Sequence, residues 1–344
     1  MTKNIKRKKK KKKIVIFLSC ITILLLVLGL GGSYVYYNLS KFKKVDISDT
    51  NEDLGIEDSS LEIINSKETN NSVTNIALFG LDQRDPNEPC RSDAMMVLSV
   101  DQAHKKIKMI SIMRDSYVNI DGHGEDKLNH AYAFGGPQLA IKTLNKNFKL
   151  NIKDFISINF FEMEKLIDDL GGVEIDVKPQ EMTLINEYMQ EVASITNTAP
   201  TPLEQSGHQL LNGRQALSYS RIRHYGDGDY ERTERQRKVL EQLMNKIISA
   251  NISQYPSLIN KLSTHVETSL SNTEMLSLGT SAVTSGTTAI EKVRFPYDGY
   301  FYDSGKMING VWYLPYDLDL TSKQIHDYIY DDVLPKKKDY SPNK

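Results

Sequence analysis

Short, nearly continuous apolar runs alternate along the chain with segments whose apolar residues recur at helical spacing. The first three runs, 75–80, 94–100 and 107–113, predict strands covered on both faces, because only such strands would be apolar along their whole length. Further strands are expected at 155–159, 174–177, 293–296 and 311–314, and helices at 136–148, 160–170, 231–250 and 321–330. Strands and helices that alternate without a repeat predict an α/β protein, with three α/β/α layers around a mixed central sheet.

A stretch of 24 uncharged residues, 14–37, precedes this domain. As a helix it would be ~36 Å long, enough to cross a hydrocarbon core of ~30 Å with some tilt. Nine Lys and Arg lie within residues 1–13, and basic flanks stay on the cytoplasmic side. We therefore expect a single-pass type II protein of the cell membrane, with a cytoplasmic tail at 1–13, a transmembrane anchor at 14–37 and an extracellular remainder. The competing interpretation, a cleaved signal peptide, lacks an A-x-A-like site, and the apolar run is too long for a signal core.

Composition divides the remainder of the chain. Residues 38–74 are polar and acidic with isolated Leu and Ile, which predicts a polar stalk before a domain at 75–335 and a flexible tail at 336–344. Without the nine basic residues of the tail, the chain has 34 basic and 44 acidic side chains, a net charge of −10. This balance argues against a nucleic-acid-binding domain. Cys20 would lie in the anchor and Cys90 outside it, so the two thiols cannot pair within one chain.

Charged side chains stand at the ends of the first three predicted strands. Asp82 follows the first strand, Arg91 and Asp93 precede the second, and Arg114 and Asp115 follow the third. Strand ends line the binding crevice in layered α/β proteins. The carboxylates of Asp82 and Asp93 suit Mg²⁺ (or Mn²⁺), which binds one or two carboxylates together with phosphate oxygens and water. The alternative for any single pair is a solvated ion pair of little consequence.

A second group of arginines lies further along the chain. Arg221 and Arg223 share a face only if their segment is extended. Arg232, Arg235 and Gln236 share one face of the first turn of the longest helix, where an anion would be favoured. One guanidinium group can bind two phosphate oxygens at once. Several guanidinium groups beside a divalent ion therefore predict a diphosphate ligand. The alternative, local ion pairs between Arg235 and nearby Glu residues, leaves Arg221 and Arg223 unexplained.

Seven ordered segments between about residues 75 and 250 resemble the successive motifs of the LytR-CpsA-Psr catalytic domain. They are LFGLDQR (78–84), RSDAMM (91–96), SIMRDSYV (111–118), KLNHAYAFGG (127–136), NFFEMEKLIDDLGGVEIDV (159–177), LNGRQALSYSRIR (211–223) and DYERTERQ (229–236). The resemblance implies an α/β/α domain with a hydrophobic tunnel for a polyprenyl tail. It also implies transfer of wall teichoic acid, capsule or a related glycopolymer from a polyprenyl diphosphate to peptidoglycan muramic acid.

Carried over residue by residue, the resemblance makes Asp82 and Asp93 the metal-linked carboxylates. It places a further set around the diphosphate: Arg84, Arg114, Lys127, Asn129, Arg221, Arg223, Arg232 and Gln236. The chain departs from the family pattern at Met113, where Pro is usual, at His130, where a small residue is usual, and at Arg237, where a second Gln is usual. None of these departures removes a charge that the chemistry needs.

These residues lead to a hypothesis of Mg²⁺-dependent phosphotransfer. Arg114, Arg221 and Arg223 would neutralise charge while a muramic acid hydroxyl attacks the sugar-side phosphorus, polyprenyl phosphate leaves, and Asp229 takes the proton. A polyprenyl-pyrophosphate hydrolase would use nearly the same residues. A non-catalytic envelope regulator or lipid-binding protein is the third interpretation, although the 13 expected cytoplasmic residues are too few for a DNA-reading fold and suit anionic lipid headgroups.

Overall fold

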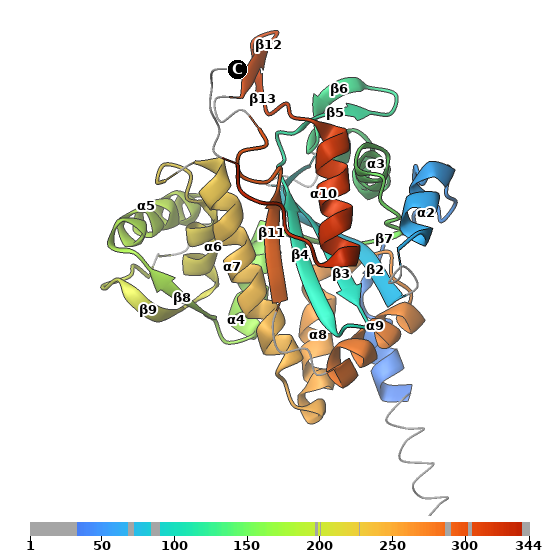
Figure 1. Ribbon diagram of the computed structural model, residues 1–344. Helices are drawn as coiled ribbons and strands as arrows, with labels where there is room; N and C mark the ends of the chain where they lie inside the picture. The colour runs from blue at the N-terminus through green and yellow to red at the C-terminus, as the bar shows by residue number, and fades with distance from the viewer. Residues whose placement is uncertain are drawn as a thin grey trace, which may run out of the picture.

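A seven-stranded mixed sheet forms the centre of the protein (Figure 1). The computed structural model describes residues 33–67, 72–83, 90–196, 199, 201–226, 228–285, 290–301 and 305–338. In spatial order the strands are β1 (Lys43–Lys44), β10 (Val266–Thr268), β7 (Asp154–Asn159), β2 (Val73–Asp82), β3 (Arg91–Asp101), β4 (Lys106–Ile112) and β11 (Ile290–Phe295). β3 is antiparallel to both β2 and β4, whereas β7 runs parallel to β2 and β11 parallel to β4. The mixed sheet is therefore confirmed.

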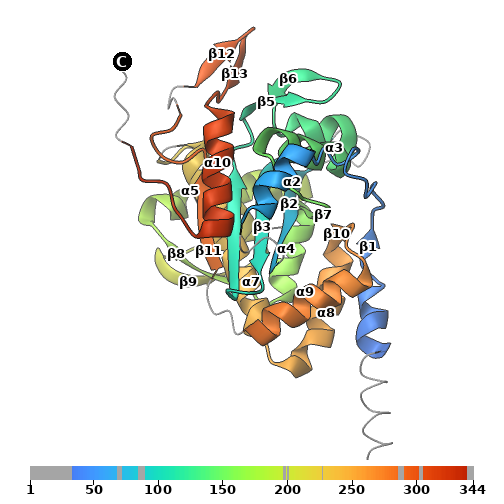
Figure 2. The same cartoon turned by 45° about the vertical axis from the view of Figure 1, so that its right-hand side comes forward.

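Helices cover both faces of this sheet (Figure 2). On β3, Met95 and Val97 belong to a core cluster with α3 (His130–Phe148) and α10 (Leu318–Asp331). The alternating Met96 packs instead in a cluster with residues of α7 (Asp229–Ile248). Because alternate side chains of a strand point to opposite faces, α3 and α10 lie on one side and α7 on the other. α4 (Phe160–Asp169) and α8 (Tyr255–His265) contact each other, and α9 (Asn272–Ser285) follows them in the chain. The α/β/α layering matches the prediction.

A smaller lobe packs beside α4 and α7 around its own apolar cluster. It consists of the two-stranded sheet of β8 (Val173–Val177) and β9 (Gly207–Leu211) and of helices α5 (Pro179–Thr196) and α6 (Gly213–Arg221). The side chains of Asn212 and Gln215 form a capping box at the start of α6. A Cβ on Gly213 would lie 1.9 Å from the Glu164 carbonyl oxygen, so glycine allows α6 to approach α4 closely. The lobe thereby fixes the end of α6, from which two of the predicted site arginines project.

The predicted stalk at 38–74 differs from the structure. Lys43 and Lys44 form β1, which pairs with β10, and α2 (Asp58–Asn65) packs on the domain. Leu54 is 0% exposed and Ile64 2% exposed, and both belong to the main core. The apolar residues are too sparse to show a periodicity, yet all of them except Ile63 are buried or half-buried. The folded domain therefore begins well before residue 75.

Most of the predicted anchor, 14–37, lies outside the described residues. The described chain begins at residue 33, and residues 33–39 form a helix. None of the helices in the described part of the chain is both long and apolar enough to span a bilayer. Of the predicted tail, 336–338 are described and have no regular structure.

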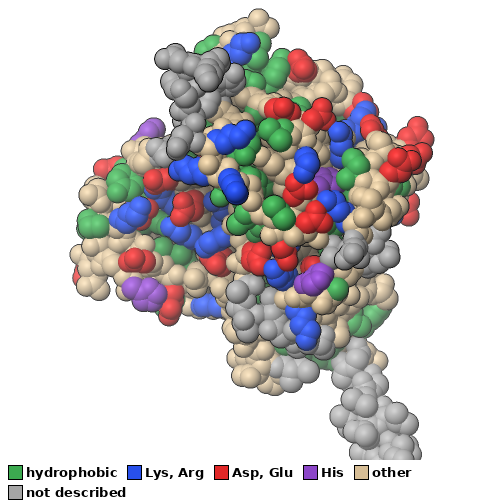
Figure 3. All heavy atoms as spheres, in the orientation of Figure 1, with side chains coloured by type: hydrophobic (Ala, Val, Ile, Leu, Met, Phe, Trp, Pro, Cys, Tyr) green, Lys and Arg blue, Asp and Glu red, His purple; other side chains and the backbone are tan. Residues whose placement is uncertain are grey.

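Two hairpins stand at one end of the sheet. They are β5 (Tyr117–Ile120) with β6 (Gly124–Lys127) and β12 (Lys306–Ile308) with β13 (Val311–Tyr313). Only the last of these strands was expected from the sequence. On the face seen in Figure 3, Lys and Arg side chains are interspersed with Asp and Glu and form no continuous basic surface.

Candidate active site

A pocket of about 430 Å³ opens where β2 ends, β3 begins and the chain leaves β4. It is lined by Asp82, Arg91, Asp93, Arg114 and Arg223. These three chain segments meet at one edge because β3 runs antiparallel to both neighbours, and Asp82 pairs directly with Arg91 in the β2–β3 register. The expected convergence of charged strand ends is thus present.

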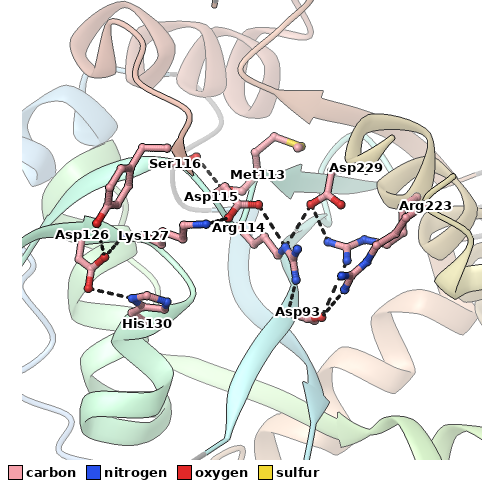
Figure 4. Close-up of polar contacts among 12 residues, drawn as sticks. Asp93, Met113, Arg114, Asp115, Ser116, Asp126, Lys127, His130, Arg223 and Asp229 are labelled. Atoms are coloured by element: carbon pink, nitrogen blue, oxygen red, sulfur yellow. Dashed lines mark hydrogen bonds and ion pairs between the residues drawn. The ribbon is translucent and has the colours of Figure 1, made fainter. Parts of the chain in front are cut away.

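Asp93 is the centre of the polar network (Figure 4). Its Oδ1 accepts a hydrogen bond from Arg114 Nη1 at 2.5 Å, and its Oδ2 accepts one from Arg223 Nη2 at 3.2 Å. Arg232 Nη1 lies 3.9 Å from the same Oδ2. Three guanidinium groups from three separate segments therefore meet at one carboxylate.

Arg114 connects this carboxylate to two others. Its Nε donates to Asp115 Oδ2 at 3.2 Å and to Asp229 Oδ2 at 3.1 Å. Burial alone would lower the pKa of Arg114, but Asp93, Asp229 and Asp115 outweigh it and raise that pKa above its usual range. The guanidinium is permanently charged and is held from both sides, which fixes its direction at the mouth of the pocket.

Arg232 has less compensation for its charge. Its side chain is 3% exposed, and Nη2 donates to Asp229 Oδ2 at 2.8 Å. Its Nε has no hydrogen-bond partner within the described residues. Burial, together with the nearby Arg114, lowers the pKa of Arg232 to about 10. A buried cation with an unused N–H group would be stabilised by an anionic ligand.

Lys127 lies on the other side of Arg114. Its Nζ donates to Asp115 Oδ1 at 2.6 Å and stands 5.9 Å from the Trp312 ring centre. Burial would raise the pKa of Asp115, but Arg114 and Lys127 outweigh it and hold the pKa below its usual range. Asn129 is buried just after β6, and its backbone N–H donates to the Arg114 carbonyl oxygen at 3.1 Å. Lys127 and Asn129 therefore both adjoin Arg114.

The structure does not gather all the predicted residues at this pocket. The segment around Arg221 is not extended: Arg221 ends α6, where its Nη2 lies 3.7 Å from Glu191 Oε1, whereas Arg223 follows the helix and reaches Asp93. Gln236 is half-buried one turn along α7 from Arg232. Arg84 lies outside the described residues.

Arg235 has a structural role that differs from the expected anion contact. Its side chain is 2% exposed, ion-pairs with Glu181 and Glu231, and donates to the carbonyl oxygens of Ile222 and Tyr225. These contacts hold the segment after α6 against α7. Helical spacing placed Arg235 on the same face as Arg232, but the lobe built by α5 covers it.

The metal prediction rests on the donor set at the pocket. Asp82 and Asp93 both line the pocket, and their carboxylate oxygens are hard ligands that suit Mg²⁺ if a phosphate ligand and water complete the coordination. Within the described residues, no group of three or more His, Cys, Asp or Glu is arranged to hold an ion. The residues fit a metal that is bound together with its substrate more closely than a metal held by protein alone.

Two residues were expected only as charged strand ends and were given no role at the site. Arg91 lines the pocket directly, and Asp115 links Arg114 to Lys127. Both are adjacent in sequence to predicted residues or lie in the same cluster, so strand-end position was the available signal.

An α/β/α protein with several arginines and carboxylates around one pocket at a sheet edge is suited to binding a phosphorylated anion. The model of the LytR_cpsA_psr family matches residues 34–327, and the chain belongs to this family. A relative from Enterococcus faecalis named polyisoprenyl-teichoic acid–peptidoglycan teichoic acid transferase TagU is 34% identical over 260 residues, which are 74% of this chain and 78% of the relative. The regulatory protein MsrR of Staphylococcus aureus is 29% identical over 266 residues, 76% of each chain.

A solved structure shares the fold. It is the LytR-CPS2A-psr family protein YwtF (TagT) with bound octaprenyl pyrophosphate lipid, at a TM-score of 0.54 and 27% identity, covering 75% of this chain and 90% of that one. The match extends over most of the described domain.

Proposed function

We propose that the protein transfers a glycopolymer from a polyprenyl diphosphate to peptidoglycan and releases polyprenyl phosphate. The convergence of Arg114, Arg223 and Arg232 on Asp93 carries this proposal, because it concentrates positive charge at a pocket mouth where a diphosphate could bind. The name of the relative TagU and the lipid bound to the TagT structure support the same class of donor.

In this reaction Arg114 and Arg223 bind the diphosphate oxygens and neutralise the charge that develops on the transferred phosphoryl group. The incompletely compensated charge of Arg232 adds to the positive charge of these two residues. Arg221 and Gln236 are assigned to the outer part of the same ligand. When bound to Asp82 and Asp93, Mg²⁺ (or Mn²⁺) would supply further charge neutralisation at the diphosphate. Lys127 keeps Asp115 paired, so that Arg114 stays directed at the pocket.

The acceptor is a muramic acid hydroxyl of peptidoglycan, which attacks the phosphorus on the sugar side. Asp229 is the proposed proton acceptor. Both of its guanidinium partners, Arg114 and Arg232, bind Oδ2. The uncharged stretch at 14–37 and the basic residues before it favour a membrane anchor that keeps the domain outside the cell, beside both lipid-linked donor and wall.

Arg114→Ala tests the proposal. Removing a group that stabilises transition-state charge lowers kcat by about 10²–10³ in comparable sites. Arg214→Ala is the matched control, because the Arg214 side chain is 14% exposed against 18% for Arg114 and pairs with Glu164 on α4. We expect Arg114→Ala to lose transfer of polymer from purified lipid-linked donor while its circular dichroism is unchanged. An active Arg114→Ala protein would refute the assigned role.

Hydrolysis of the donor is the principal alternative, since water could replace the glycan hydroxyl at the same residues. The two reactions differ in whether the acceptor is required. A purely regulatory role, which the name of MsrR would favour, predicts tight lipid binding with no turnover under either condition.

A further inference from the structure

Two hairpins of the protein, β5–β6 and β12–β13, join beside the pocket, and of their residues the resemblance places only Lys127 near the diphosphate. The Tyr117 ring of β5 and the Tyr313 ring of β13 meet edge to face, with centres 4.9 Å apart. Tyr313 donates its hydroxyl hydrogen to Asp126 Oδ1 on β6 at 3.2 Å. Ser116, two residues after Arg114, bridges to Leu314 just beyond β13. The β12–β13 hairpin is thus attached to the chain that carries Arg114.

Trp312 lies at the centre of this attachment. It is half-buried and packs against the cluster of Met113, Phe301 and Leu314. A Cβ on Gly305 would lie 2.3 Å from a ring carbon of Trp312, so the indole is seated directly on the backbone of the hairpin. We call the half-buried Tyr117 and Trp312 the aromatic rim; Tyr313, which is 9% exposed, packs against the Tyr117 ring.

The rim continues into apolar side chains that contribute little to the core. Met307 is directly opposite Trp312 in the hairpin register and is 61% exposed. Directly opposite residues project to the same face of a hairpin, so Met307 extends the surface of the indole. Val311, 40% exposed, precedes Trp312 in β13 and projects to the opposite face of the hairpin. Hydrophobic side chains are visible at this end of the molecule in Figure 3, where Figure 1 places the hairpin.

Arg114 stands between Asp93 and Lys127 (Figure 4). On one side it contacts Asp93, which also binds Arg223. On the other it contacts Asp115, which binds Lys127, whose Nζ lies 5.9 Å from the Trp312 ring centre and 5.8 Å from that of Tyr313. In phosphoryl transfer the attacking hydroxyl and the leaving oxygen lie roughly in line, on opposite sides of the transferred phosphorus. The diphosphate takes the Asp93 side, which leaves the Lys127 side for the acceptor.

We propose that the aromatic rim, with Met307 and Lys127, is the acceptor subsite and binds the amino-sugar rings of the glycan whose hydroxyl attacks the donor. This proposal rests on the proposed function. The C–H groups on the face of a pyranose ring carry a slight positive charge and pack on the electron-rich face of an aromatic ring. The remaining N–H donors of Lys127 and the carboxylate of Asp126 stand beside the rings, where hydroxyl and acetamido groups would need partners.

Tryptophan fluorescence measures binding at this subsite directly. Trp312 is the single tryptophan of the chain, so its emission, excited at wavelengths that tyrosine does not absorb, reports on the rim alone. The probe is the disaccharide of N-acetylglucosamine and N-acetylmuramic acid, and the stem peptide without sugar is the control. We expect a saturable change of emission with the disaccharide and none with the peptide. An emission that is unchanged at millimolar disaccharide would overturn the proposal.

Variants separate a binding role from a structural one. Trp312→Ala should raise the acceptor KM by about tenfold or more and leave the donor KM unchanged, because a lost binding contact raises KM for that substrate alone. Trp312→Phe keeps an aromatic face and should recover much of this loss. Tyr255→Ala on α8, another partly exposed aromatic position, is the control and should behave as the wild type.

The outcomes distinguish the subsite from the reaction. If the wild type forms no transfer product but the disaccharide still changes Trp312 emission, the proposed function fails and the glycan subsite stands. If transfer proceeds and Trp312→Ala keeps the wild-type acceptor KM, the subsite is refuted and the function stands.

Discussion

Two buried arginines, two positions apart on α7, lead to opposite predictions for stability. Arg235 is fully paired, with two carboxylates and two backbone carbonyl groups as partners. Arg237 is 7% exposed, and its Nε and Nη1 find no hydrogen-bond partner within the described residues. Burial, and then the neighbouring Arg294, lower the pKa of Arg237 to about 10.

The size of the effect follows from that pKa. A fall from the model-compound value of 12.5 to about 10 corresponds to a penalty of roughly 3 kcal/mol for the charged form in the folded state. The unfolded chain does not carry this penalty, so it is fully present at neutral pH and disappears only as the pH rises above about 10 toward the unfolded value. Arg237→Met removes the charge and keeps most of the side-chain volume. We expect it to raise the free energy of unfolding by roughly 1–3 kcal/mol. Each kcal/mol corresponds to a rise in Tm of ~2–4 °C.

Arg235→Met is the matched control. It leaves Glu181, which is 3% exposed, as a buried carboxylate without its guanidinium, and loss of one partner of such a pair costs about 3–5 kcal/mol. Urea denaturation followed by circular dichroism gives both free energies. If Arg237→Met is destabilised to the same extent as Arg235→Met, the interpretation of Arg237 as an uncompensated charge is wrong.

Three further predictions concern the N-terminal segment, the free thiol and the metal. A chain that begins at residue 75 lacks β1 and α2 and exposes the core around Leu54, so it should not give the circular dichroism of the longer chain; a normal spectrum would restore the stalk interpretation. Burial, with Asp82 and then Asp93, raises the pKa of Cys90 to about 11, so in a Cys20→Ser protein its alkylation rate should climb with pH up to about 11; a plateau near pH 9 would contradict this. A chelator should abolish transfer and Mg²⁺ restore it, and Asp82→Asn should need at least about tenfold more Mg²⁺, whereas activity that is indifferent to the chelator would exclude the metal.

Strand positions were predictable because the buried strands are almost wholly apolar. The runs at 75–80, 94–100 and 107–113 became the centre of β2, β3 and β4, and the charged residues at their ends met at one pocket. They meet because β3 runs antiparallel to β2 and β4, a direction that the apolar pattern alone does not give.

Features set by tertiary contacts were not predictable from local pattern. The segment before residue 75 looked like a stalk because its few buried residues, such as Leu54 and Ile64, show no period. The direction of Arg221 depends on where α6 ends, and the burial of Arg235 depends on a lobe built from α5 and β8. Trp312 gave no signal in the sequence, because a lone tryptophan in a short strand is equally typical of a core.

The fate of solvent oxygen tests the proposed transfer most directly. The full chain is incubated with purified lipid-linked glycopolymer in ¹⁸O-labelled water, with and without peptidoglycan, and the phosphate products are analysed by mass spectrometry. If a glycan hydroxyl attacks the sugar-side phosphorus, polymer becomes bound to peptidoglycan, polyprenyl phosphate is released only when peptidoglycan is present, and neither product contains ¹⁸O. Release without peptidoglycan, with ¹⁸O in one of the phosphates, would show that the protein hydrolyses the donor and would contradict the account.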